Sequence, residues 1–133
     1  MASSNFISQG PLTRLCNIIT PIGMLGYGLD QGLLEEALEE CAPTGVPTAI
    51  ILDSGSTDGG PACLALGVMT CPRLNYKRDL EKILEAGHRF NVPVLISSAG
   101  GDGSDEHVEE ILKICEEIAE APGNEYVQWR SVK

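Results

Sequence analysis

The chain has 133 residues, of which 43% are hydrophobic and 21% are charged, an ordinary balance for a single globular domain. Its 19 acidic and 9 basic residues give a formal net charge of -10, which argues against nucleic acid or an anionic membrane as a partner. No run of about 18 apolar residues occurs, so we expect no transmembrane helix.

The five cysteines favour a reducing compartment. They are odd in number and contain no Cys-x-x-Cys pair, and Cys16, Cys41 and Cys115 fall at apolar positions of predicted strands or helices. We therefore expect small buried thiols rather than disulfides or a zinc site. Residues 1–14 are polar and lack the apolar segment of a secretory signal, so we expect a cytoplasmic protein.

Residues 1–13 are predicted to form a flexible arm, and residues 14–133 a single α/β domain. Within the domain an apolar run, a glycine-rich loop and an amphipathic helix follow one another repeatedly. In the first unit, residues 15–20 are the predicted strand and residues 21–28 the loop. Asp30 is a good cap for the helix that follows.

In the second unit, the predicted strand at 48–52 ends at Asp53, and a loop rich in serine and glycine follows it. A short helix over 62–68 is expected, with Pro61 in its first turn, and then a longer helix over 73–90. The third unit has a strand at 92–97, a loop at 98–103 and a helix capped by Ser104. Residues 125–132, with Trp129, are expected to form a last short strand.

These elements predict a three-layer, Rossmann-like α/β fold. Strand–helix alternation indicates a mostly parallel sheet of three to five strands with right-handed crossovers. The second and third strands are almost continuously apolar, which is typical of strands covered by helices on both faces.

The candidate site lies at the carboxyl ends of the strands, where ligands bind in open parallel sheets. All three glycine-rich loops should converge there, although none matches a phosphate-binding or nucleophile motif. The candidate catalytic residues are Asp53, Asp58 and Ser56, because carboxylates at strand ends can act as general bases or bind hard cations. The candidate substrate-binding residues are Gly26, Tyr27, Ser54, Gly55, Thr57, Gly59, Lys77, Arg78, Ser98, Gly100 and Gly101.

Cations are scarce, yet Arg73, Lys77 and Arg78 cluster at the start of the long helix, where the helix dipole already adds positive potential. An anionic ligand, a carboxylate or a phosphate, would explain this placement. Pairing with Asp79, Glu81 or other surface acids is the alternative.

Other polar residues have simpler structural interpretations. Asp102 is predicted to be a turn residue, and Ser104 only a helix cap. His88 and His107 are expected on solvated helix faces. Tyr27 either lines a pocket or covers the edge of the sheet.

The sequences of the three glycine-rich loops and of the long helix around Lys77 and Arg78 together resemble the N-terminal part of the acyclic terpene utilisation (AtuA-type) family. The most specific string is Asp53-Ser-Gly-Ser-Thr-Asp-Gly-Gly-Pro61, and the resemblance extends over residues 15–121. It adds weight to residues in the shared strings, and it implies a role in breaking down acyclic isoprenoids through acyl-CoA intermediates. Members of that family are typically several times longer.

The resemblance implies an enzyme acting on an organic acid or its CoA thioester, by hydration, elimination or isomerisation next to a carbonyl. Loop N–H groups would stabilise negative charge, and Asp53 or Asp58 would move a proton. A non-catalytic binding module and a subunit of a larger assembly, a homo-oligomer or a hetero-complex, are the alternatives. A metal-dependent hydrolase using Asp53, Asp58 and Asp102 is a minor option, and magnesium would be its metal.

Overall fold

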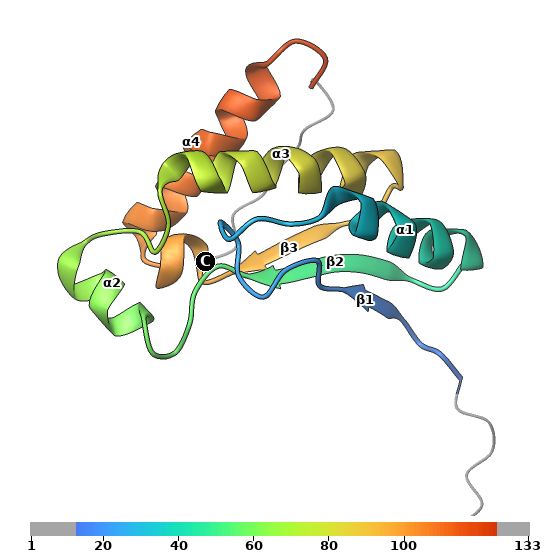
Figure 1. Cartoon of the computed structure of the whole chain (residues 1–133), viewed down its shortest axis with the longest axis horizontal. Helices are drawn as coiled ribbons and strands as arrows, with labels where there is room; N and C mark the ends of the chain where they lie inside the picture. The colour runs from blue at the N-terminus through green and yellow to red at the C-terminus, as the bar shows by residue number, and fades with distance from the viewer. Residues whose placement is uncertain (1–12, 125–133) are drawn as a thin grey trace, which may run out of the picture.

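A three-stranded parallel sheet is the centre of the structure, which is a computed structural model describing residues 13–124 (Figure 1). The strands are β1 (Asn17–Ile19), β2 (Thr48–Asp53) and β3 (Val94–Ser97). The helices are α1 (Gln31–Cys41), α2 (Gly60–Leu66), α3 (Arg73–Arg89) and α4 (Asp105–Glu120), with short 3-10 turns η1 (Ala42–Thr44) and η2 (Ala99–Gly101). The predicted α/β class and parallel sheet are confirmed.

Local sequence signals place the helix ends. The side chain of Asp30 accepts a hydrogen bond from the Leu33 N–H at 3.2 Å, which is the predicted cap of α1. Pro61 occupies the first turn of α2, where its missing N–H costs nothing. Gly67 ends α2 at φ 61°, a left-handed conformation that glycine adopts readily.

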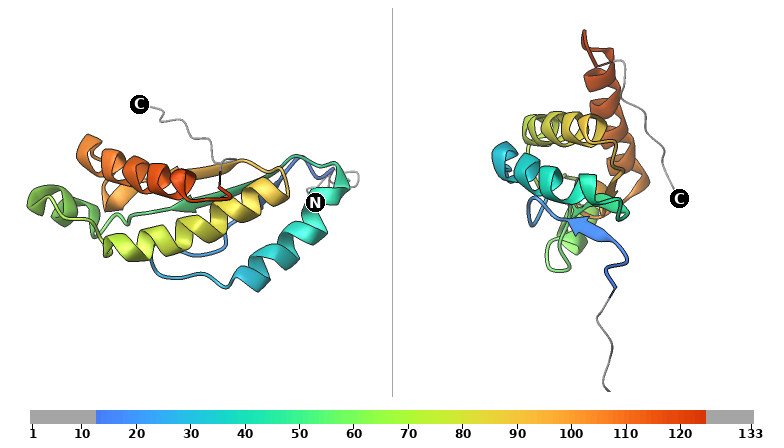
Figure 2. Two further views of the ribbon diagram at one scale, coloured as in Figure 1. Left: turned by 90° about the horizontal axis from the view of Figure 1, so that it is seen from above. Right: turned by 90° about the vertical axis from the view of Figure 1, so that its right-hand side faces the viewer.

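The strands follow one another across the sheet in the order β1-β2-β3. Because both crossovers advance in the same direction, a single handedness puts their helices on the same face. Figure 2 shows α1, α3 and α4 side by side over that face, and α2 lies beyond the carboxyl end of the sheet.

The main core lies between this helical layer and the sheet. From β2, Ile50 and Leu52 point into it and are buried. They belong to one cluster with the apolar faces of the three long helices, including Leu34, Leu38, Leu80, Ile83, Ile111, Ile114 and Ile118. The helical spacing of these residues is the periodicity from which the helices were predicted.

The opposite face of the sheet, called here the open face, carries Ile18, Ala49, Ile51 and Leu95. Register places Ile18 beside Ala49, and Ile51 beside Leu95. Ile18 is 61% exposed and Leu95 is 49% exposed. The expected helices on this second face are not found among residues 13–124, because the strand order directs both crossovers to the first face. The expected arm and last strand lie outside the described residues, apart from Thr13.

Two further expectations concern the membrane and the thiols. Among the described residues, no helix is long and apolar enough to cross a membrane. All five cysteines are free thiols, of which Cys63, Cys71 and Cys115 are buried and Cys41 is partly buried. The expectation was wrong for Cys16, which is exposed because it precedes the short edge strand β1.

Candidate functional site at the carboxyl edge

The three glycine-rich loops meet at the carboxyl edge of the sheet, as predicted. A Cβ atom on Gly55 would lie 2.2 Å from the carbonyl oxygen of Gly101, so the second and third loops are in backbone contact. The N–H of Leu25 donates to the carbonyl of Asp53 at 2.9 Å and joins the first loop to the second. Glycine at position 55 is required by this close approach.

Asp53 ends β2, and its side chain organises this edge. Its Oδ1 accepts hydrogen bonds from the N–H groups of Ser54 at 2.8 Å and Gly55 at 3.1 Å, and from the Ser97 hydroxyl at 3.1 Å. Burial alone would raise the pKa of Asp53, but these bonds, led by the one from Gly55 and joined by one from Ser98, lower it below its ordinary value. A carboxylate held in this way is a weak base.

Most glycine N–H groups of the loops already have partners within the protein. Gly59 donates to the Ser56 hydroxyl, Gly100 to the Ser54 hydroxyl and Gly101 to the Ser98 carbonyl. These donors are therefore not available to stabilise negative charge on a ligand. The side chains of Ser56, Thr57 and Asp58 are exposed ahead of α2.

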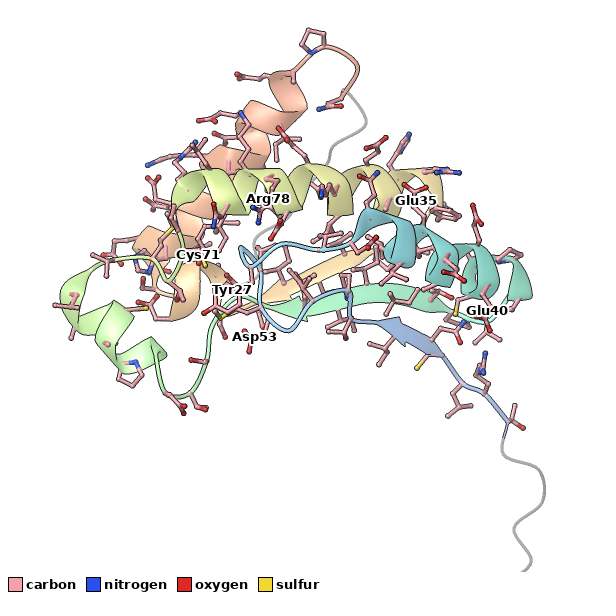
Figure 3. The ribbon with its side chains drawn as sticks, viewed as in Figure 1. Tyr27, Glu35, Glu40, Asp53, Cys71 and Arg78 are labelled. Atoms are coloured by element: carbon pink, nitrogen blue, oxygen red, sulfur yellow. The ribbon has the colours of Figure 1, made fainter. Side chains whose placement is uncertain are left out.

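The first loop is held by a buried carboxylate from α3. The Oδ2 of Asp79 accepts the N–H groups of Gly26 and Gly28, each at 2.9 Å, and its Oδ1 accepts the Arg78 Nε–H at 2.8 Å. Arg78 is thus paired with the protein's own Asp79, which was one of the expected alternatives. Tyr27, between the two glycines, is exposed at the same edge (Figure 3).

The other two cations of the cluster at the start of α3 are paired as well. Arg73 and Lys77 both bind Glu117 of α4, with Nη2–Oε1 and Nζ–Oε2 distances of 2.6 and 3.4 Å. The hydrogen bond from Arg73 lowers the pKa of Glu117 despite some desolvation. These ion pairs, like that of Arg78, account for the cation cluster without an anionic ligand.

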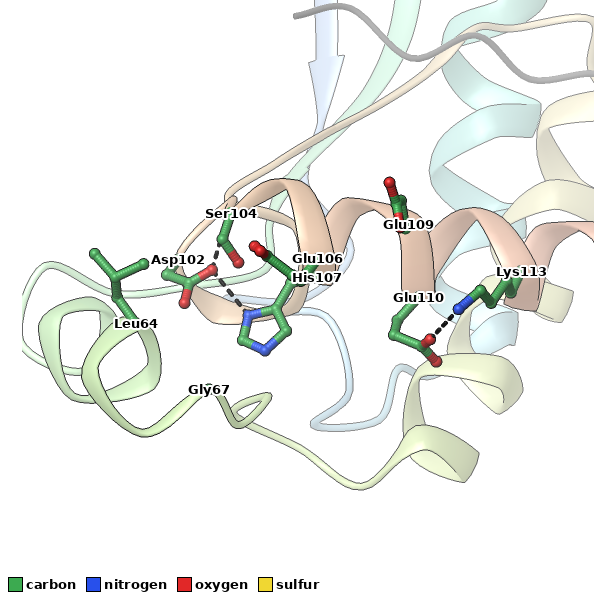
Figure 4. Close-up of a pocket in the computed structure, with 9 residues that line it drawn as sticks. All are labelled: Leu64, Gly67, Asp102, Ser104, Glu106, His107, Glu109, Glu110 and Lys113. Atoms are coloured by element: carbon green, nitrogen blue, oxygen red, sulfur yellow. Dashed lines mark hydrogen bonds and ion pairs between the residues drawn. The ribbon is translucent and has the colours of Figure 1, made fainter.

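A groove of about 600 Å³ lies next to these loops, between α2 and the start of α4 (Figure 4). At its inner wall the Nδ1 of His107 lies 2.8 Å from Oδ1 of Asp102. The same oxygen accepts the Ser104 N–H at 2.8 Å. The prediction that Asp102 is a turn residue is confirmed, because its side chain accepts the Ser104 N–H two residues on. The expectation that His107 is solvated was wrong, because α4 turns the histidine inward onto η2.

Asp102 is ionised and poorly solvated. Burial would raise its pKa, but hydrogen bonds from the backbone and hydroxyl of Ser104 and from His107 lower it below the ordinary value. Its second oxygen, Oδ2, is buried without a hydrogen-bond partner. The sequence signal for the Asp102–His107 pair is the position of His107 in the first turn of a helix that Asp102 precedes. This spacing lets the two side chains reach each other.

A metal centre has no support in the described part of the chain. No group of three or more His, Cys, Asp or Glu side chains is placed there to hold a metal ion. Asp53, Asp58 and Asp102, the residues of the magnesium option, therefore do not form such a group.

Comparisons with known proteins add no relative. No family model, no curated protein and no solved structure matches the chain.

Proposed function

We propose that the chain is a subunit of an enzyme of the acyclic terpene utilisation type, and that a second copy packs on the open face of the sheet. The observation that carries the proposal is the exposure of Ile18 and Leu95 on the two outer strands of one sheet face, with the partly buried Ala49 and Ile51 of β2 between them. Contiguous exposed apolar surface on a soluble protein marks an interaction site.

The charge of the open face fits a second copy. Ile18, Ala49, Ile51 and Leu95 are uncharged, although the chain carries a net charge of -10. The long helices, which carry many of the acidic residues, lie over the other face of the sheet. Two copies can therefore join open face to open face while their acidic helices remain apart and solvated.

The hydrogen bonding at the carboxyl edge also favours a second copy as partner. Its loop N–H groups and the cations of α3 are used within the chain, so one copy offers few free groups to an anionic substrate. Asp53 and Ser97 are paired in register at the end of the open face. A second copy seated there would bury Asp53 further and thereby increase its basicity.

The proposed reaction is proton transfer next to the carbonyl of an organic acid or its CoA thioester, with Asp53 as the base. The support for this substrate class is the resemblance of the loop strings, and the support for Asp53 is its place at the strand end beside two serine hydroxyls. A second candidate, a non-catalytic binding module, is favoured by the low basicity of Asp53 in the single chain.

The test is thermal unfolding of the purified chain with coenzyme A, branched acyl-CoAs and free organic acids. A ligand at about 100 times its Kd stabilises the fold by about 2.7 kcal/mol. We expect this stabilisation in the wild type and its loss in Leu95→Lys. Leu33→Lys is the matched control, because it places the same charge at an exposed leucine of α1.

The outcomes separate the candidates. Stabilisation that depends on Leu95, with turnover that Asp53→Asn abolishes, supports the enzyme subunit. Stabilisation without any turnover supports the binding module. No stabilisation by any compound contradicts the proposed substrate class, and an equal response in Leu95→Lys contradicts the role of the open face.

A further inference from the structure

We propose that the groove between α2 and α4 binds a small primary amine or amino alcohol through Asp102 and His107. Nothing in the proposed function uses this groove. Its carboxylate and imidazole form a recognition site that is separate from the open face and from the ion pairs of α3.

The two polar side chains are fixed and almost fully buried. The side chain of Asp102 is 3% exposed and that of His107 is 7% exposed. Since the ionised carboxylate can only accept, the hydrogen on this bond belongs to Nδ1 of His107. In the neutral ring Nε2 is then the acceptor, and Figure 4 shows it directed away from Asp102, toward the space beside Gly67.

The carboxylate has an unused position for a donor. Oδ1 of Asp102 already accepts from Ser104 and His107, whereas Oδ2 is buried with no partner. A buried acceptor without a hydrogen bond lowers the stability of the fold, and more so if it is charged. Because Oδ2 is shielded from solvent, an N–H or O–H group of a ligand reaches it only after a small movement of the groove wall. The hydrogen bond then formed recovers that lost stability, and this is why the position favours a donor.

The walls of the groove select the charge of the ligand. Glu106, Glu109 and Glu110 line it together with Asp102. Glu110 is paired with Lys113, the only lysine in the lining, and lies 3.9 Å from Arg73, so the negative potential comes from Asp102, Glu106 and Glu109. This potential repels carboxylates and phosphates and attracts an ammonium group. Leu64 supplies an apolar wall that suits a short carbon chain.

The third loop is shaped to hold this site. Gly100 has φ 72°, and a Cβ atom there would lie 2.6 Å from Cβ of His107. The glycine thus lets η2 pack directly against the start of α4. The Asp102–His107 pair is consequently held in place by the folded edge of the sheet.

The experiment is an amide NMR titration of the full chain with ethanolamine, and with acetate as an anion of similar size. We expect ethanolamine to give saturable shifts at residues 64–67 and 102–107, and acetate to give none. Asp102→Asn should weaken ethanolamine binding at least tenfold. Glu116→Gln, which removes an exposed carboxylate of α4 outside the groove, should leave binding unchanged.

A second pair of variants avoids the buried residues. Leu64→Lys puts a cation at the groove wall and should weaken ethanolamine binding at least tenfold, whereas Leu66→Lys, on the same helix but outside the lining, should not. Equal binding of acetate, equal effects of the two lysine variants, or no saturable shift with ethanolamine would overturn the proposal.

Discussion

The two faces of the sheet belong to the same three strands but have different surroundings. On the covered face, Ile50 and Leu52 are buried under the long helices. On the open face, Ile18 and Leu95 are 61% and 49% exposed, although they are equally apolar. The difference shows that the apolar surface of these strands exceeds what the helices within residues 13–124 cover.

This contrast changes the interpretation of the apolar strand sequences. Almost continuous apolar runs predict strands that are covered on both sides, and the expected cover was a second layer of helices. The strand order directs the crossovers to one face, so residues 13–124 provide one layer only. In the proposed function, another copy of the chain provides the second cover.

The largest effect is expected from a pair of leucine truncations. Leu52→Ala removes a buried side chain and should lower the free energy of unfolding by about 2–5 kcal/mol. Leu95→Ala should lower it by less than about 1 kcal/mol in the dilute chain. Urea unfolding at low protein concentration measures both, and equal losses would contradict the distinction between the faces.

A glycine substitution tests the edge where the two faces end. Gly55→Ala forces a Cβ atom against the Gly101 carbonyl and should cost about 1–3 kcal/mol. Gly23→Ala is the matched control, because nothing lies within 4 Å of its Cβ position. Unfolding midpoints in urea compare the two, and a harmless Gly55→Ala would mean that the loops are not in contact.

The pH dependence of stability tests the pair at the start of α4. The folded-state pKa of Asp102 is below its ordinary value, so its ionised form stabilises the fold above the unfolded-state pKa of about 3.9. That contribution should be lost as the pH falls through the lower, folded value. Asp102→Asn should flatten the profile of urea midpoint against pH in this acid range.

Asp58→Asn provides the control for this profile, because Asp58 is an exposed carboxylate on a nearby loop. It should keep the acid-induced loss of the wild type. A profile of Asp102→Asn that is indistinguishable from that of Asp58→Asn would show that Asp102 gains nothing from Ser104 and His107.

The smallest effect is expected at the exposed ion pairs between α3 and α4. Glu117→Gln should lower the free energy of unfolding only slightly at low salt and by less at high salt, because exposed ion pairs are screened. Glu116→Gln, also on α4, is the control. A larger loss that resists salt would show that Arg73 and Lys77 do more than pair at the surface.

Elements with local signals were predictable from the sequence. The side chain of Asp30 caps α1 by accepting the Leu33 N–H, and Pro61 lies in the first turn of α2. Both preferences act within one helical turn. The meeting of the loops followed from the rule that parallel strands end at one edge. No distant contact was needed for these predictions.

What escaped prediction depends on side chains meeting across the fold. Glu117 lies on α4, 44 residues after Arg73, so the sequence alone could not identify it as the partner. His107 was expected on a solvated helix face, whereas its orientation onto Asp102 is set by the packing of α4 against η2. The uncovered face depends on strand order, which local patterns do not contain.

The most direct test of the central claim is sedimentation velocity of the full chain across a wide concentration range. The account predicts a monomer–dimer equilibrium in the wild type and in Leu33→Lys, and a monomer in Ile18→Lys and Leu95→Lys. A wild-type chain that stays monomeric at every concentration, or dimers that persist in both open-face variants, would contradict it.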